Sequence, residues 1–210
     1  MFITLEGPEG SGKTSQISLL ADNLREKGHD IVLTREPGGT EIGNQIRQVI
    51  MDLKNTEMHP ISEILLFQAS RAQLVNQVIR PALREGKIVL CDRYADSTLA
   101  YQGYGHQTDL NTLTQIIEFA TGGLKPDFTV LLDIDSEEGL KRRSGDDEHW
   151  NRMDAYEMAF HQRVREGYHQ LLAAEPGRWE KIDAGKLIPE VQIDLQAVIL
   201  ERISAFVKTV

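Results

Sequence analysis

Short runs of apolar and β-branched residues recur along the chain, and longer amphipathic stretches separate them. The short runs lie at residues 2–5, 31–34, 88–91, 128–133 and around 179–183. In the stretches between them, apolar residues return near the 3.6-residue period of a helix that packs on one face. Strands that alternate with helices form parallel sheets covered on both sides. The pattern therefore predicts an α/β fold with a five-stranded parallel sheet and helices on both faces.

Polar residues gather after these runs, where ligands of open parallel sheets bind. The first run is followed by G-x-x-x-x-G-K-T at residues 7–14, which opens a helical pattern. This order indicates a phosphate-binding loop, because its backbone N–H groups and the helix N-terminus can face an anion. Lys13 supplies a positive charge and Thr14 a hydroxyl for Mg²⁺. The predicted ATP-binding residues are Gly7, Pro8, Glu9, Gly10, Ser11, Gly12, Lys13 and Thr14.

A carboxylate and a guanidinium follow the third run directly, as Asp92 and Arg93. Aspartate can hold Mg²⁺, directly or through water, and arginine can bridge two phosphate oxygens. The alternative interpretation is an ion pair between these two residues at the strand end. The sequence predicts Thr14 and Asp92 as metal-binding residues, with Arg93 beside them.

The composition limits the class of protein and its partners. The chain has 210 residues, 40% of them hydrophobic and 26% charged, which is typical of a single compact domain. A formal net charge of −9 and the lack of a basic stripe argue against binding to nucleic-acid polymers. The lone cysteine, Cys91, lies in an apolar run, and no run approaches the roughly 18 apolar residues of a membrane span. We therefore expect a cytoplasmic protein that does not bind membranes.

Four motifs occur together and in a fixed order. They are the phosphate loop at residues 7–14, R-E-P-G-G-T at 35–40, F-Q-A-S-R at 67–71, and D-R-Y at 92–94 continuing to A-Y-Q at 100–102. In this combination the chain closely resembles the bacterial thymidylate kinases, from residue 2 to about residue 183. The resemblance implies a P-loop NTPase fold, homodimers formed through helices on one side of the sheet, and transfer of the γ-phosphoryl of ATP to dTMP with Mg²⁺.

The resemblance also assigns the acceptor site. Phe67 would stack on the thymine ring, since an aromatic face stabilises a base by stacking, and Arg71 and Gln102 would hydrogen-bond the polar edge of the ring. Arg35 and Arg93 would hold the acceptor phosphate. The implied dTMP-binding residues are Glu9, Arg35, Glu36, Arg47, Phe67, Arg71, Arg93, Ser97, Thr98, Tyr101 and Gln102.

Two of these residues would contact the sugar, and one would support the phosphate site. Glu9 would approach the 3′-hydroxyl, and the ring of Tyr101 would crowd the 2′ position and so select deoxyribose. Arg47 would help to hold the phosphate, although an exposed arginine on a helix is an ordinary feature.

Thymidylate kinases carry the catalytic arginine either in the phosphate loop or in a basic lid. Positions 8–11 of this loop hold no arginine, so the resemblance implies a mobile lid at about residues 141–154. The motif at residues 151–154 reads N-R-M-D, which departs from the D-R-x-E form typical of the family, and which lid arginine acts stays open. The candidate catalytic residues are Lys13, Arg93, Arg142, Arg143 and Arg152.

Two other functions are compatible with a phosphate loop. One is a kinase that acts on another nucleoside monophosphate, such as dUMP, but Arg71, Tyr101 and Gln102 favour dTMP. The other is a nucleotide-dependent switch without a small-molecule acceptor. The sequence has no N-K-x-D element of the kind that GTPases use to read guanine, which disfavours the switch.

Overall fold

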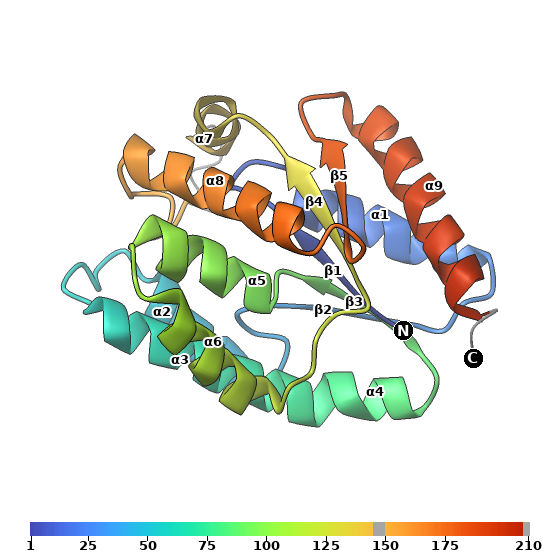
Figure 1. The fold of residues 1–210 in the computed structure, drawn as a ribbon, viewed down its shortest axis with the longest axis horizontal. Helices are drawn as coiled ribbons and strands as arrows, with labels where there is room; N and C mark the ends of the chain where they lie inside the picture. The colour runs from blue at the N-terminus through green and yellow to red at the C-terminus, as the bar shows by residue number, and fades with distance from the viewer. Residues whose placement is uncertain (145–149, 208–210) are drawn as a thin grey trace.

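The five predicted strands form one parallel sheet in the computed structural model, which describes residues 1–144 and 150–207 (Figure 1). The strands are β1 (Phe2–Glu6), β2 (Ile31–Arg35), β3 (Ile88–Asp92), β4 (Phe128–Asp133) and β5 (Trp179–Asp183). Their order across the sheet is β2-β3-β1-β4-β5, and all neighbouring strands run parallel. The predicted fold class is confirmed.

Three strands extend one residue beyond their predicted ends. Glu6, Arg35 and Asp92 are therefore the last residues of β1, β2 and β3, and they do not belong to the loops that follow. Because parallel strands end at a common edge, these three charged side chains start from neighbouring positions on the rigid sheet. The register pairs Arg35 with Asp92 across β2 and β3.

Helices cover both faces of the sheet. They are α1 (Lys13–Glu26), α2 (Glu41–Met51), α3 (Pro60–Leu74), α4 (Arg80–Arg84), α5 (Ala95–Thr98), α6 (Leu110–Thr121), α7 (Ser136–Ser144), α8 (Met158–Ala174) and α9 (Ile188–Val207). Two segments are π-helical, η1 (Val75–Ile79) and η2 (Leu99–Gly105). None of the described helices is long and apolar enough to cross a membrane.

Successive residues of each strand point to opposite faces, which divides the core. On one face, Ile3 and Leu5 of β1 pack among apolar side chains of α1 and α9. On the other face, Phe2 and Val89 pack against α3, η1 and α4, while Leu131 packs near η2 and α8 (Figure 1). The three central strands, β1, β3 and β4, are thus buried on both sides, and a site is expected at the carboxyl edge of the sheet.

The segment η2 carries two predicted site residues, Tyr101 and Gln102, and continues α5 without a break. It packs along α8, where Tyr101, Phe160 and Tyr168 belong to one buried cluster. π-Helical turns are rare, and they occur frequently at functional sites. The packing on α8 holds both side chains at the carboxyl edge of the sheet.

Candidate active site

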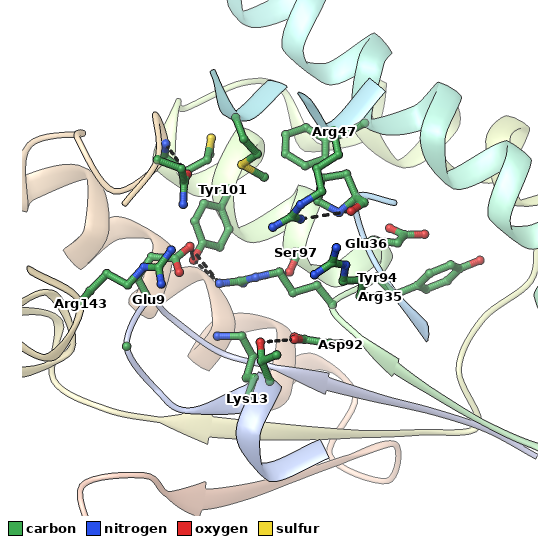
Figure 2. Close-up of a pocket in the computed structure, with 18 of the residues that line it drawn as sticks. Glu9, Lys13, Arg35, Glu36, Arg47, Asp92, Tyr94, Ser97, Tyr101 and Arg143 are labelled. Carbon is green, nitrogen blue, oxygen red and sulfur yellow. Dashed lines mark hydrogen bonds and ion pairs between the residues drawn. The ribbon is translucent and has the colours of Figure 1, made fainter. Parts of the chain in front are cut away.

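A cavity of about 640 Å³ opens at the carboxyl ends of the strands (Figure 2). All eleven residues that the sequence assigned to the acceptor site contribute to its lining. Lys13 and Asp92 lie at one end of the cavity, and Arg47 lies toward the other (Figure 2). The fold therefore brings residues from four separate motifs into one space.

The phosphate loop joins β1 to α1 and depends on glycine at Gly10. This residue has φ 71°, and a Cβ atom there would lie 1.9 Å from the carbonyl oxygen of Gly139. Only glycine fits such a left-handed turn against the backbone of α7. No side chain caps the N-terminus of α1, so its first N–H groups remain available for an anion.

Lys13 lies buried against this loop. Its Nζ atom donates to the carbonyl oxygens of Gly7 and Pro8, at 2.9 and 2.8 Å, and to Ser11 Oγ at 2.9 Å. Burial lowers the pKa of Lys13 to about 8, and the neighbouring Arg93 acts in the same direction. Phosphate oxygens could replace the loop carbonyls as acceptors and would favour the charged ammonium.

Thr14 and Asp92 meet at the same end of the cavity. Thr14 Oγ1 donates to Asp92 Oδ2 at 2.6 Å, while the buried Oδ1 has no hydrogen-bond partner among the described residues. A hydroxyl beside an unpartnered carboxylate oxygen suits a hard cation such as Mg²⁺. The described residues contain no group of three or more His, Cys, Asp or Glu side chains that could hold a metal. A cation here would need phosphate oxygens or water to complete its coordination.

Arg93 connects the phosphate loop to the acceptor side. It adopts φ 67°, a left-handed conformation, in the turn that follows β3. Its guanidinium donates to Glu9 Oε1 at 2.9 Å, to the Gly7 carbonyl at 2.9 Å, and to the hydroxyls of Tyr101 at 3.0 Å and Tyr168 at 3.1 Å. This network fixes the arginine between the two ends of the cavity.

Glu9 is ionised in this network. Burial acts to raise its pKa, but the charges of Arg93 and Lys13 outweigh burial and lower the pKa to about 2. The Tyr101 hydroxyl also donates to Glu9 Oε1, at 3.0 Å. The carboxylate therefore remains available as an acceptor at neutral pH.

The sequence did not identify Glu6, which is fully buried beneath Arg93. Its Oε1 accepts from the Tyr94 backbone N–H at 2.7 Å, and its Oε2 accepts from Ser97 Oγ at 2.6 Å and from Tyr168 Oη at 3.1 Å. Burial is the main cause that raises the pKa of Glu6 to about 7. The available signal was a carboxylate directly after an apolar strand. No sequence signal pointed to Tyr168, which lies on α8.

Beyond the phosphate loop, three arginines add positive charge to the lining of the cavity. Arg35 and Arg47 line it together with Arg93, and Arg47 also donates to the Pro37 carbonyl at 3.1 Å. Burial, followed by the charges of neighbouring arginines, lowers the pKa of Arg47. Three guanidinium groups close together favour a ligand that carries more than one negative charge.

The wall opposite the phosphate loop is polar and rigid. Arg71 is buried, and its Nε donates to Glu36 Oε2 at 2.7 Å. Its Nη1 donates to Gln68 Oε1 at 2.8 Å and Thr98 Oγ1 at 3.0 Å, and its Nη2 donates to the Tyr94 carbonyl at 2.9 Å. A ligand that accepts from Arg71 must share or replace one of these acceptors.

Phe67 and Gln102 complete this wall. Phe67 is half-buried and shows part of its ring, while Gln102 is buried and donates from Nε2 to Glu63 Oε1 at 2.7 Å. Met51 and Met153 add apolar surface. The wall thus combines one aromatic ring, fixed polar groups and two thioethers, which suits a flat heterocycle.

The structure separates the three candidate lid arginines. Arg142 and Arg143 line the cavity, whereas Arg152 does not. Arg152 is buried. Its guanidinium donates to the carboxylate of Glu63, to the Ile50 carbonyl at 2.8 Å and to Tyr156 Oη at 2.8 Å. In this arrangement the guanidinium of Arg152 is directed to Glu63 and not into the cavity. The sequence could not reveal its buried partner on α3.

The two lining arginines have different partners. Arg142 Nη1 donates to the Ala184 carbonyl at 2.8 Å, just after β5, and Nη2 donates to Glu138 Oε1 at 2.6 Å. Arg143 lies beside Glu9 (Figure 2), and its Nε donates to Asp154 Oδ1 at 3.1 Å. Residues 145–149 of the expected lid lie outside the described residues.

The chain is similar to known proteins over most of its length. The family model "Thymidylate kinase" matches residues 5–195. The chain is 51% identical to "Thymidylate kinase" of Roseiflexus sp. (strain RS-1), covering 95% of this chain and 93% of that protein. It is 49% identical to "Thymidylate kinase" of Exiguobacterium sp. (strain ATCC BAA-1283 / AT1b), covering 97% and 95%.

A solved structure of a related protein has a similar fold. The crystal structure of thymidylate kinase from Ehrlichia chaffeensis superposes with a TM-score of 0.78 at 35% identity, covering 95% of this chain and 98% of that one. The residues matched by the family model span most of the chain. They include the phosphate loop and the cavity residues that follow β2 and β3. The chain therefore belongs to the thymidylate kinase family.

Proposed function

We propose that this protein transfers the γ-phosphoryl group of ATP to dTMP, giving dTDP and ADP. The observation that carries the proposal is a single cavity in which a phosphate-binding loop faces Arg35, Arg47 and Arg93, with a polar and aromatic wall beyond them. Such a space can hold two phosphate-bearing ligands end to end. Alignment of donor and acceptor is the main catalytic requirement of phosphoryl transfer.

The phosphate loop is the proposed ATP side. Its backbone N–H groups and the N-terminus of α1 would bind the phosphates, and Lys13 would exchange the carbonyls of Gly7 and Pro8 for phosphate oxygens. Thr14 and the free oxygen of Asp92 would hold Mg²⁺, directly or through water. When bound, the cation would neutralise negative charge on the phosphates.

The arginine cluster is the proposed phosphate site for dTMP. Arg35, Arg47 and Arg93 would hold the acceptor phosphate, and Glu9 with Tyr101 would keep Arg93 oriented and approach the sugar. An oxygen of the acceptor phosphate already carries negative charge, so the attack needs no general base. The contribution of these residues is orientation and charge stabilisation.

Arg143 is our first candidate for stabilising the migrating phosphoryl group. It lies beside Glu9 at the phosphate loop, and its charge helps to lower the pKa of Glu9 (Figure 2). Arg142 is instead held by the carbonyls of Ala184 and Gly185, beyond β5. An arginine near the transferred group stabilises the transition state, whereas one beyond β5 is placed to contact the ATP base.

We also propose a homodimer formed through α2, α3 and α6, which lie side by side on one flank of the molecule (Figure 1). These helices and the turn after α2 expose several large apolar side chains. They are Ile42, Val49, Leu53, Ile61, Leu65 and Phe119. Phe119 is 91% exposed, and a gathering of this kind favours a protein partner. Light scattering should give twice the chain mass, and Phe119→Asp should reduce it to one chain mass.

The chain is proposed to act as one domain in the cytoplasm. The strands of one continuous sheet lie between residues 2 and 183, and helices from along the described chain pack on this sheet. Burial raises the pKa of the Cys91 thiol well above its usual value, which suits an unreactive core residue that is kept reduced.

The test of the proposed reaction is identification of both products. Purified protein is mixed with ATP and MgCl₂, and with dTMP, dUMP, dCMP or no acceptor, and the nucleotides are separated by chromatography. We expect equal amounts of ADP and dTDP from dTMP, at a higher rate than with the other acceptors, and no product from Lys13→Ala. ADP without any nucleoside diphosphate of the acceptor would contradict the proposal.

A further inference from the structure

A buried carboxylate lies behind the acceptor wall without lining the cavity. The side chain of Glu63, on α3, is 1% exposed. Its Oε1 accepts from Gln102 Nε2 at 2.7 Å, and its Oε2 accepts from Tyr156 Oη at 3.1 Å and from Arg152 Nη2. Burial acts to raise the pKa of Glu63, but His106, Arg152 and Gln102 together lower it to about 2. At neutral pH this carboxylate carries no proton and can only accept hydrogen bonds.

This contact fixes the orientation of the Gln102 amide. A glutamine amide has a donating NH₂ end and an accepting carbonyl end, and only the NH₂ end can face an ionised carboxylate. If the amide reversed, its carbonyl oxygen would oppose Glu63 Oε1 in a place with almost no solvent, since Gln102 is 1% exposed. Glu63 Oε1 would still have His106 Nε2 3.3 Å away, but it would oppose a second acceptor instead of a donor, which is unfavourable in a buried site. Glu63 thus holds the NH₂ end toward α3.

We propose that Glu63 is a positioning residue for base specificity, because it leaves the carbonyl end of Gln102 to face the ligand. A carbonyl oxygen in that place accepts from a pyrimidine that has an N–H at ring position 3, as thymine and uracil have. Cytosine has an unprotonated nitrogen there, which also accepts and is therefore disfavoured. The inference rests on the proposed function, since it requires the pyrimidine of dTMP to lie against Gln102.

The geometry makes a selective prediction. Thymine and uracil share the N–H at position 3, so Glu63 should separate dTMP from dCMP and should not separate dTMP from dUMP. A residue that only supports the fold would change the rates with all three acceptors together. The pattern across the three pyrimidines therefore distinguishes positioning from general support.

The decisive variant is Glu63→Gln, which preserves the shape of the side chain. Glutamine can present either end to Gln102, so it no longer fixes the direction of that amide. It also weakens the contact with Arg152, and Tyr156→Phe serves as the matched control. Among the described residues, the Tyr156 hydroxyl bonds to Arg152 and the other oxygen of Glu63, so its removal leaves the hydrogen bond to Gln102 in place.

The measurement is kcat/KM for dTMP, dUMP and dCMP in the wild type and both variants. In Glu63→Gln the preference for dTMP over dCMP should fall about tenfold or more, because a buried hydrogen bond no longer discriminates between the rings. The preference for dTMP over dUMP should change less than about twofold in the same variant. Tyr156→Phe should keep both preferences.

Two results would overturn the inference. One is an unchanged preference for dTMP over dCMP in Glu63→Gln, and the other is an equal loss of both preferences in Glu63→Gln or in Tyr156→Phe.

A second measurement applies if Glu63→Gln does not fold. Calorimetry on the wild type without ATP compares dTMP with its N3-methyl derivative, which has no hydrogen to donate at that ring position. Equal affinity for the two would also overturn the inference, because the contact proposed for Gln102 requires that hydrogen. A wild type that binds dTMP selectively but makes no dTDP would contradict the proposed reaction and not the role of Glu63.

Discussion

Replacing Glu6 with glutamine should change how the stability of the protein depends on pH. Glu6 is fully buried at the end of β1, and its carboxylate accepts from the Tyr94 N–H and the Ser97 hydroxyl. Burial is the largest cause that raises its pKa from 4.5 to about 7, and the charge of Asp96 adds to it. Glutamine has nearly the same shape but cannot titrate, so Glu6→Gln isolates this effect.

The sign and size follow from the shift. Because the folded protein holds the proton of Glu6 more strongly than the unfolded chain, it binds more protons between pH 4.5 and about 7. The free energy of unfolding contributed by Glu6 is therefore greatest below pH 4.5, falls as the pH rises through this window, and levels off above pH 7. The rise of the Glu6 pKa from 4.5 to about 7 corresponds to about 3 kcal/mol.

The assay is urea denaturation of wild type and Glu6→Gln at a series of pH values. The difference between their free energies of unfolding should move by about 3 kcal/mol in favour of the variant from about pH 4.5 to about pH 7. Exposed Glu26, on α1, provides the control variant Glu26→Gln. Parallel curves for wild type and Glu6→Gln across this range would refute the reasoning, since they would mean that Glu6 does not titrate there.

Three further predictions concern the charged groups of the site. Asp92→Asn should lower kcat by about a hundredfold and raise the Mg²⁺ concentration needed for half-maximal rate, as measured in a magnesium titration. Arg143→Met should lower kcat by about a thousandfold with little change in dTMP affinity, which steady-state kinetics and calorimetry can separate. Glu36→Gln leaves the buried charge of Arg71 without its carboxylate, so urea denaturation should show a loss of about 3–5 kcal/mol.

The strands and the phosphate loop could be predicted because local sequence determines them. The apolar runs placed all five strands, and both ends of β4 were predicted to the residue. Parallel strands bring their carboxyl ends together, so motifs such as those containing Arg35 and Arg93 could be assigned to one edge before their distances were known. In the structure, every residue expected in the acceptor site lines the cavity.

The buried partners could not be predicted, because they depend on contacts between distant parts of the chain. Glu6 and Tyr168 form a hydrogen bond although 162 positions separate them in the sequence. Arg152 and Glu63 form one across a separation of 89 positions. Neither pair has a sequence pattern that links its members. No pattern in the sequence therefore indicated that a buried carboxylate on α3 pairs with the charge of Arg152.

The most direct test of the central claim follows the transferred group itself. The wild-type protein is mixed in excess with ATP labelled in its γ-phosphoryl group, together with Mg²⁺ and dTMP, and a single turnover is stopped at successive times. The account predicts that the label leaves ATP and appears in dTDP at the same rate, and that Lys13→Ala leaves it in ATP. Appearance of the label as inorganic phosphate, with dTMP unchanged, would contradict it.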